Sequence, residues 1–124
     1  MADQLTPSLP ALSLAFLGDA VWELFVRSQV LGSGVTRLRD LHTATVAAVS
    51  AAGQRRALAS TAPLLSAEEG DVVRRARNAR VAGGASAEER AASAWESLLG
   101  HLYVSGQADR LAELLWAGWA GIQE

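Results

Sequence analysis

The chain has 124 residues, of which half are apolar, 19% are charged and none is cysteine. This length suits one domain with a single core and is too short for a catalytic domain plus a sizeable second module. The absence of cysteine excludes disulfides, thiol catalysis and cysteine zinc sites. The apolar stretch before Asp19 is too short to span a membrane, and no basic residue precedes it as in a signal peptide. We therefore expect a single globular domain over residues 1–124, located in the cytoplasm.

Charge is distributed unevenly along a chain whose formal net charge is −2. All 11 basic residues are arginine, and eight of them lie between Arg37 and Arg80 among only four acidic residues. The forked guanidinium group suits two-pronged contacts to phosphate or carboxylate groups. A codon bias toward arginine explains the number of arginines but not their clustering, so the middle of the chain is expected to present a positive face.

Apolar residues recur every three or four positions, and no segment alternates like a β-strand, so the predicted fold class is all-α. Pro10 precedes the first expected helix, Gly32 and Gly34 close it, and Pro63 breaks the chain further on. Ser66 and Ser86, each followed three residues later by a glutamate, form capping boxes at the start of two helices. The expected helices span about 11–31, 35–41, 43–59, 66–80, 86–104 and 108–120.

The first segment with chemical character is Leu17-Gly18-Asp19-Ala20-Val21-Trp22-Glu23. Asp19 and Glu23 are four residues apart in an otherwise apolar helix, so their side chains share one face. A glycine inside a helix costs about 1 kcal/mol relative to alanine, so Gly18 indicates close packing by another helix or room for a ligand. Buried acids need partners or a metal ion. The alternative is an acidic stripe that pairs with Arg27.

A second acid, Glu96, stands in an apolar helix with Gly100 one turn later and Ser93 one turn before it. A lone glutamate in this setting is more often a residue at the rim of the core, but two such acids on different helices favour a shared function. Mg²⁺ prefers oxygen ligands, and one or two carboxylates with waters and substrate phosphates are enough to hold it. If the two helices pack together, Asp19 and Glu96 form an open site of this kind.

The third segment is Arg74-Arg75-Ala76-Arg77-Asn78-Ala79-Arg80, near the end of a predicted helix. A cation at a helix C-terminus gains about 0.3–1 kcal/mol, but one or two arginines are enough for that purpose. Four arginines in seven residues repel one another unless an anion lies over them. The segment therefore favours phosphate contacts, with Arg74, Arg77 and Asn78 on one face.

These segments together resemble the ribonuclease III family. The stretch around Asp19 resembles the family signature, in which the aspartate after glycine is a metal ligand. The segment Trp95-Glu96-Ser97-Leu98-Leu99-Gly100 resembles the second motif, whose glutamate is the other ligand. Further segments resemble motifs of Mini-ribonuclease III, the bacterial subgroup without a double-stranded-RNA-binding domain; they are Leu41–Ala44, Val49–Ala51 with Gln54, and the arginine segment. The resemblance runs from about Leu12 to Leu115.

The resemblance implies a helical ribonuclease III endonuclease domain that works as a homodimer and hydrolyses double-stranded RNA with Mg²⁺, for which Mn²⁺ is a substitute. It makes Asp19 and Glu96 the catalytic metal ligands, with Glu23 as a further candidate, and it implies products with 5′-phosphate ends. It assigns RNA contacts to Arg74, Arg75, Arg77, Asn78 and Arg80, with His42 and Gln54 as further candidates. The task of the subgroup is maturation of the large-subunit (23S) ribosomal RNA precursor, and the sequence identifies no helper such as a ribosomal protein.

Full-length ribonuclease III carries additional acids where this chain has Leu12, Ala15 and Ser93, and the Mini-ribonuclease III subgroup shares their loss. Fewer carboxylates are therefore expected around the metal. The loop from Val81 to Ser86 is also shorter than is usual in the subgroup. The four tryptophans are expected in the core or in a subunit interface, and His101 is expected in the core. The alternative function is a helical dimer that binds structured RNA without cutting it. A further alternative is an interaction domain whose arginines meet an acidic protein.

Overall fold

The computed structural model describes residues 5–81 and 83–123, and within these ranges it contains helices and no strand. The prediction of an all-α fold is therefore confirmed. No helix in the described ranges is both long and apolar enough to cross a membrane. The elements are α1 (Ala11–Gly32), α2 (Leu38–Val49), α3 (Ala51–Thr61), the short 3-10 helix η2 (Ala62–Leu64), α4 (Ala67–Val81), α5 (Ala87–Val104) and α6 (Ala108–Gln123).

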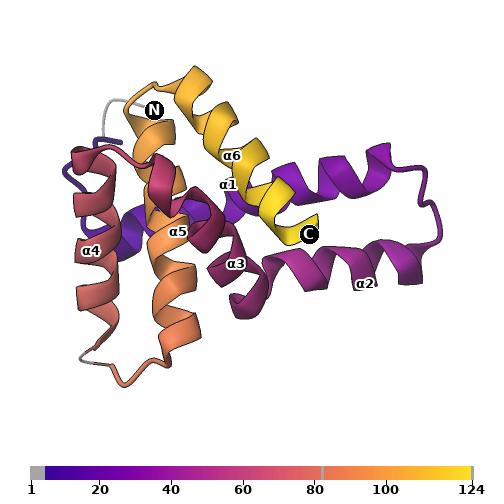
Figure 1. Ribbon diagram of the computed structural model, residues 1–124, viewed down its shortest axis with the longest axis horizontal. Helices are drawn as coiled ribbons and strands as arrows, with labels where there is room; N and C mark the ends of the chain where they lie inside the picture. The colour runs from indigo at the N-terminus through magenta and orange to yellow at the C-terminus, as the bar shows by residue number, and fades with distance from the viewer. Residues whose placement is uncertain (1–4, 82, 124) are drawn as a thin grey trace.

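Helix α5 forms the centre of the fold, because α1, α3, α4 and α6 all pack against it. Its side chains are buried along most of its length, and together with Trp22 of α1 they supply the largest residues of the core. Figure 1 shows that the C-terminal half of α1 and the whole of α2 extend away from this body as an arm. The arm is therefore less enclosed than the body, and only Ala48 of α2 is buried.

Local signals in the sequence set several helix ends as expected. The Oγ atom of Ser66 accepts a hydrogen bond from the Glu69 amide, and the Glu69 carboxylate accepts one from the Ser66 amide. Ser86 and Glu89 form the same reciprocal pair at the start of α5. Gly106 has φ of 71°, a left-handed conformation that favours glycine, and it follows the end of α5. The two predicted capping boxes are confirmed.

The prediction of a short helix at 35–41 followed by a long helix at 43–59 is wrong. Residues 33–37 are not helical, and the break lies at Ser50, between α2 and α3. Ser50 is extended, with ψ of 162°, and its Oγ atom accepts a hydrogen bond from the amide of Gly53 at 3.1 Å. A Cβ atom at Gly53 would overlap the carbonyl oxygens of Ala47 and Ala48, so glycine lets α3 begin directly against the end of α2. We call this turn the α2–α3 corner.

Candidate active site

Helices α1 and α5 cross with almost no side chain between them at two glycines. A Cβ atom at Gly18 would overlap the carbonyl oxygen of Glu96, and a Cβ atom at Gly100 would overlap that of Leu14. Each glycine therefore meets the main chain of the other helix, which brings the two helices closer than larger residues would permit. Because Asp19 follows Gly18 directly, this crossing places it beside Glu96. The expectation that Gly18 marks close packing by another helix is confirmed.

Asp19 and Glu96 open into the same pocket, which has a volume of about 240 Å³. Asp19 is exposed, whereas Glu96 is partly buried. The two side chains are close enough for Asp19 to raise the pKa of Glu96. Two acids separated by 77 positions in the sequence thus meet at one surface hollow, as the sequence predicted. The remaining lining residues are Leu12, Ala15, Phe16, Arg80 and Ser93.

The electrostatics of Glu96 are set by its burial and by Asp19. Burial raises the pKa of Glu96 well above its usual range, and the hydrogen bond and negative charge of Asp19 raise it further. A hydrogen bond from Gln54 and the charge of Arg80 act in the opposite direction. The negative charge of Glu96 is therefore costly at this position unless a cation lies nearby.

The acidic pair has the chemistry that a hard divalent cation requires, because one cation in this pocket can neutralise both carboxylates. Within the described residues, no third histidine, aspartate or glutamate joins them in a cluster able to hold a metal ion. The pocket is also lined by three uncharged residues, Leu12, Ala15 and Ser93. These are the positions at which full-length ribonuclease III was expected to carry acids. Mg²⁺ is bound through one or two carboxylates together with waters and substrate phosphates, so the pair fits this ion.

Glu23, the further candidate ligand on α1, lies outside this pocket. Its Oε1 atom is 3.2 Å from Nη2 of Arg27, one turn later on the same helix. The structure therefore favours the alternative in which Glu23 pairs with Arg27. Its position in the sequence gave it the same face as Asp19, but the pocket extends from Asp19 toward the N-terminal end of α1 and not toward Glu23.

Gln54 is buried behind the acidic pair, with only 3% of its surface exposed. Its Nε2 atom donates to Oε2 of Glu96 at 3.2 Å and to the carbonyl oxygen of Val49 at 3.0 Å. This burial does not fit the expected contact between Gln54 and RNA. The sequence did carry a signal for the burial of Gln54, because this residue lies in helical register with Ala57, Leu58 and Thr61 on the buried face of α3.

The arginine segment occupies the C-terminal half of α4, where its side chains are mostly exposed. Arg74 and Arg75 both pair with Asp71, whereas Arg77 forms no ion pair with any residue that the structure describes. Asn78 is exposed beside Arg77. Arg80 differs from the rest of the segment because it lines the pocket of Asp19 and Glu96.

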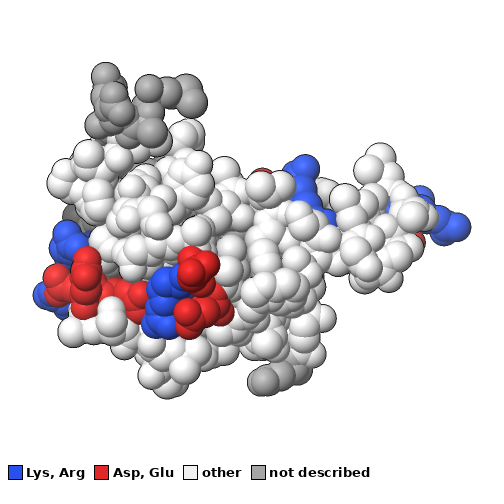
Figure 2. Space-filling view, turned by 90° about the horizontal axis from the view of Figure 1, so that it is seen from above, with Lys and Arg blue, Asp and Glu red and all other residues white. Residues whose placement is uncertain are grey.

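Acidic side chains gather on one side of the body, where several of them pair with arginine. Figure 2 shows acidic side chains, mixed with arginine, on the side of the body where α4 and α6 begin, and a separate basic group at the tip of the arm. The exposed arginines of α4 lie toward the opposite end of that helix. An anionic partner would therefore be attracted to the C-terminal end of α4 and not to its start.

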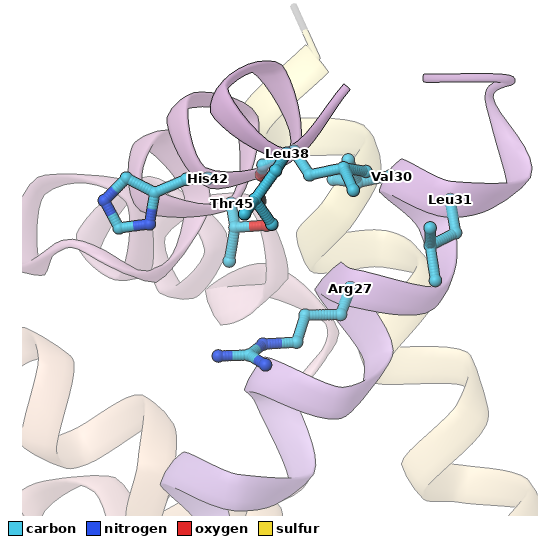
Figure 3. Close-up of a pocket in the computed structure, with 7 residues that line it drawn as sticks. Arg27, Val30, Leu31, Leu38, His42 and Thr45 are labelled. Atoms are coloured by element: carbon cyan, nitrogen blue, oxygen red, sulfur yellow. Dashed lines mark hydrogen bonds between the residues drawn. The ribbon is translucent and has the colours of Figure 1, made fainter. Parts of the chain in front are cut away.

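His42 lies away from the acidic pair, on the exposed surface of α2. It lines a second pocket of about 290 Å³ in the arm, between α1 and α2. Figure 3 shows the imidazole of His42 and the guanidinium of Arg27 extending toward the same side of this pocket, whose other walls are mainly apolar. A contact between His42 and RNA stays a prediction, and it would be made by the arm.

Comparisons with known proteins agree with this architecture. The model of the Ribonuclease III domain matches residues 12–107. A Mini-ribonuclease 3 from Symbiobacterium thermophilum is 45% identical over 121 residues, which cover 94% of this chain and 92% of that protein. A Mini-ribonuclease 3 from Brevibacillus brevis is 39% identical over 118 residues, covering 90% of this chain and 87% of that protein. A crystal structure of a protein from Fusobacterium nucleatum superposes with a TM-score of 0.75 at 26% identity, over 87% of this chain and 89% of that one.

The chain therefore belongs to the ribonuclease III family. Its class of activity is that of a double-stranded-RNA-specific endoribonuclease. Within the family, the similarity over nearly the whole chain places it in the Mini-ribonuclease III subgroup, as its motifs indicated.

Proposed function

We propose that this protein is a Mg²⁺-dependent endoribonuclease that cleaves double-stranded RNA as a homodimer and acts in the maturation of the 23S ribosomal RNA precursor in the cytoplasm. The observation that carries the catalytic part is the meeting of Asp19 and Glu96 in one pocket beside Arg80. Family membership supports the substrate class, and the resemblance to the Mini-ribonuclease III subgroup supports the ribosomal substrate.

Asp19 and Glu96 are the residues that would hold the cation, and Mn²⁺ would be accepted in place of Mg²⁺. When bound, such an ion supplies positive charge to the phosphodiester under attack and makes a water molecule a better nucleophile at neutral pH. Asp19 lies on the exposed side of the pair, where solvent and a phosphate group can reach it. Glu96, held from behind by Gln54, forms the inner wall.

Arg80 would bind a non-bridging oxygen of the phosphodiester that is cut. Its guanidinium lines the pocket, and Nη2 lies 3.8 Å from Oε2 of Glu89, a separation that holds it loosely. Because this ion pair is long and partly exposed, a phosphate group entering the pocket can replace Glu89 at little cost. Positive charge at this place stabilises the negative charge that develops during hydrolysis.

The other arginines of α4 would bind the backbone of the duplex. Arg74, Arg75, Arg77 and Asn78 are exposed side by side on one helix, and a duplex of A-form RNA is recognised mainly through its shape and phosphates. Contacts of this type displace counterions, so the affinity should fall steeply as salt rises. His42 on the arm would add a contact further along the same duplex.

The homodimer would form through the exposed apolar face of α1. Leu12, Phe16 and Leu24 are exposed by 41%, 85% and 70%, and with Ala20 they follow one another every four residues along the helix. A continuous apolar stripe of this kind marks an interface in a soluble protein. Because Phe16 also lines the acidic pocket, a partner on this face would bring the two active sites near one another.

Cleavage of a duplex RNA in Mg²⁺ tests the proposal, with wild type compared with Asp19→Asn and Glu96→Gln. Both substitutions keep the size of the side chain and remove its negative charge, so we expect cleavage to fall by at least about a hundredfold while RNA binding in EDTA persists. Wild type that binds the duplex but never cuts it would instead support the non-catalytic RNA-binding dimer. Variants that cut as fast as wild type would show that the acidic pair is not the active site.

A further inference from the structure

The amide of Gln54 is held between the active-site acid and the main chain. An amide nitrogen carries two hydrogens, and Nε2 uses them on Glu96 at 3.2 Å and on the carbonyl of Val49 at 3.0 Å. The reverse orientation would place the amide oxygen against two acceptors. The two contacts therefore fix the direction of the amide group.

The second anchor of Gln54 is rigid because it belongs to the α2–α3 corner. Val49 is the last residue of α2, so its carbonyl has no partner within that helix. The neighbouring carbonyl of Ala48 accepts a hydrogen bond from the buried indole of Trp22 at 3.1 Å, and Ser50 caps α3. The hydrogen bonds of Gln54 therefore hold the Glu96 carboxylate at a fixed position relative to the main chain of the corner.

Packing alone does not explain a glutamine at this position. Its Oε1 atom is buried and has no hydrogen-bond partner among the described residues, an arrangement that costs stability. An apolar residue of similar size would avoid this cost. A lysine or arginine would also reach Glu96, but its charge would repel a cation in the pocket. A neutral amide supplies a donor to Glu96 and leaves the negative charge of the acidic pair intact.

From this arrangement, we infer that Gln54 is a positioning residue of the cation site: its amide keeps the Glu96 carboxylate turned so that it and Asp19 present their oxygens to one divalent cation. This inference rests on the proposed function, because it assigns a role toward the cation of that site. In this role Gln54 contacts Glu96 from the side away from the RNA, and it does not contact the RNA itself, contrary to the expectation from the sequence.

Binding of Mn²⁺ alone, without RNA, tests the role by electron paramagnetic resonance. Gln54→Met keeps the length of the side chain and removes both donors, so we expect the dissociation constant for Mn²⁺ to rise about 10- to 100-fold. Thr61→Val is the matched control, because it removes a buried hydrogen-bonding group from the same face of α3 without touching Glu96 or the corner, and it should change the constant less than about twofold. In cleavage assays, Gln54→Met should need correspondingly more Mg²⁺ for its half-maximal rate, whereas its affinity for RNA in EDTA stays that of wild type.

A second measurement uses the wild-type chain and keeps the test valid if Gln54→Met does not fold. The side-chain amide signals of Gln54 in a ¹⁵N NMR spectrum should shift during a Mg²⁺ titration, while those of Gln29 and Gln107 remain in place. If these signals stay still, or folded Gln54→Met binds Mn²⁺ as tightly as wild type, the inference fails and the acidic pair keeps its role. If Asp19→Asn binds Mn²⁺ as tightly as wild type, the cation site is wrongly assigned and both proposals fall.

Discussion

The Cα atom of Gly18 on α1 lies against the main-chain carbonyl of Glu96 on α5, with no space for a side chain between them. The contact joins the residue before one acid of the candidate site to the backbone of the other. The separation of the two carboxylates is therefore set by main-chain packing, which is stiffer than contacts between long side chains.

Gly18→Ala should consequently damage both stability and the site. The added methyl group meets backbone that cannot rotate away, and overpacking of this kind costs about 1–3 kcal/mol, occasionally more. Pushing the helices apart also separates Asp19 from Glu96, so the affinity for Mn²⁺ should fall with stability. Urea unfolding and Mn²⁺ binding measure the two effects.

Gly70→Ala serves as the control for this substitution. A Cβ atom at Gly70 of α4 would have no neighbour within 4 Å, so alanine there should raise stability by up to about 1 kcal/mol and leave Mn²⁺ binding unchanged. Equal and small effects of the two substitutions would mean that the crossing is not as tight as the structure shows.

Arg80 and Arg77 should affect different kinetic constants, although both belong to the arginine segment of α4. Arg80 lines the acidic pocket, so Arg80→Gln should lower kcat about 10- to 100-fold with little change in KM. Arg77 is outside the pocket, so Arg77→Gln should weaken RNA binding without changing kcat. The slope of log affinity against log salt concentration should become shallower by about one, as expected for the loss of one phosphate contact. Steady-state cleavage and binding at several salt concentrations distinguish the two. Identical profiles would place both arginines in general RNA binding.

Leu24→Glu should dissociate the proposed homodimer without unfolding the protomer. Leu24 is 70% exposed and does not line the acidic pocket, so a charge is tolerated in the free chain but is costly in an apolar interface. We expect the dimer dissociation constant to rise by at least about tenfold in sedimentation experiments. Leu64→Glu is the control, because Leu64 is 54% exposed but belongs to η2 and not to α1. A wild-type chain that sediments as a monomer at high concentration would contradict the proposed dimer.

The sequence predicted the fold best where a local signal determined the structure. The capping boxes at Ser66 and Ser86 and the glycine after α5 act within one helical turn, so they were recognisable without any tertiary contact. The break at Ser50 was missed because its cap is a serine followed three residues later by Gly53, without the glutamate that marks the two capping boxes. Trp22 donates to a carbonyl at the end of α2, and an alanine-rich stretch gives no sign of that contact.

The candidate site shows the same division. Two acids beside glycines in apolar helices were enough to predict that Asp19 and Glu96 meet, because such acids need partners. The number of ligands and the role of Gln54 depend on which faces turn toward the crossing, and periodicity does not determine this rotation. Glu23, on the same face of α1 in the sequence pattern, instead lies beside Arg27.

The ion pair between Glu69 and Arg110 should make stability fall at low pH. The Glu69 carboxylate is buried and accepts hydrogen bonds from Nε and Nη2 of Arg110 at 2.9 and 2.8 Å, which joins α4 to α6. The hydrogen bonds from Arg110 have the largest effect, and together with those from Ser66 they lower the pKa of Glu69 from 4.5 to about 2 despite burial. Because the pKa is lower in the folded state, the stabilisation is complete above about pH 4.5 and is lost as the pH falls toward 2.

Glu69→Gln removes this charge while keeping the shape of the side chain, so it should cost about 3 kcal/mol at pH 7. The difference from wild type should shrink as the pH is lowered from 4.5 to 3, because wild-type Glu69 begins to bind a proton in the unfolded state first. Glu113→Gln removes the exposed partner of the same arginine and should cost less than about 0.5 kcal/mol. Urea unfolding of wild type and the two variants at several pH values measures these effects. A difference in the free energy of unfolding between wild type and Glu69→Gln that stays constant from pH 7 to pH 3 would show that the charge of Glu69 does not stabilise the fold.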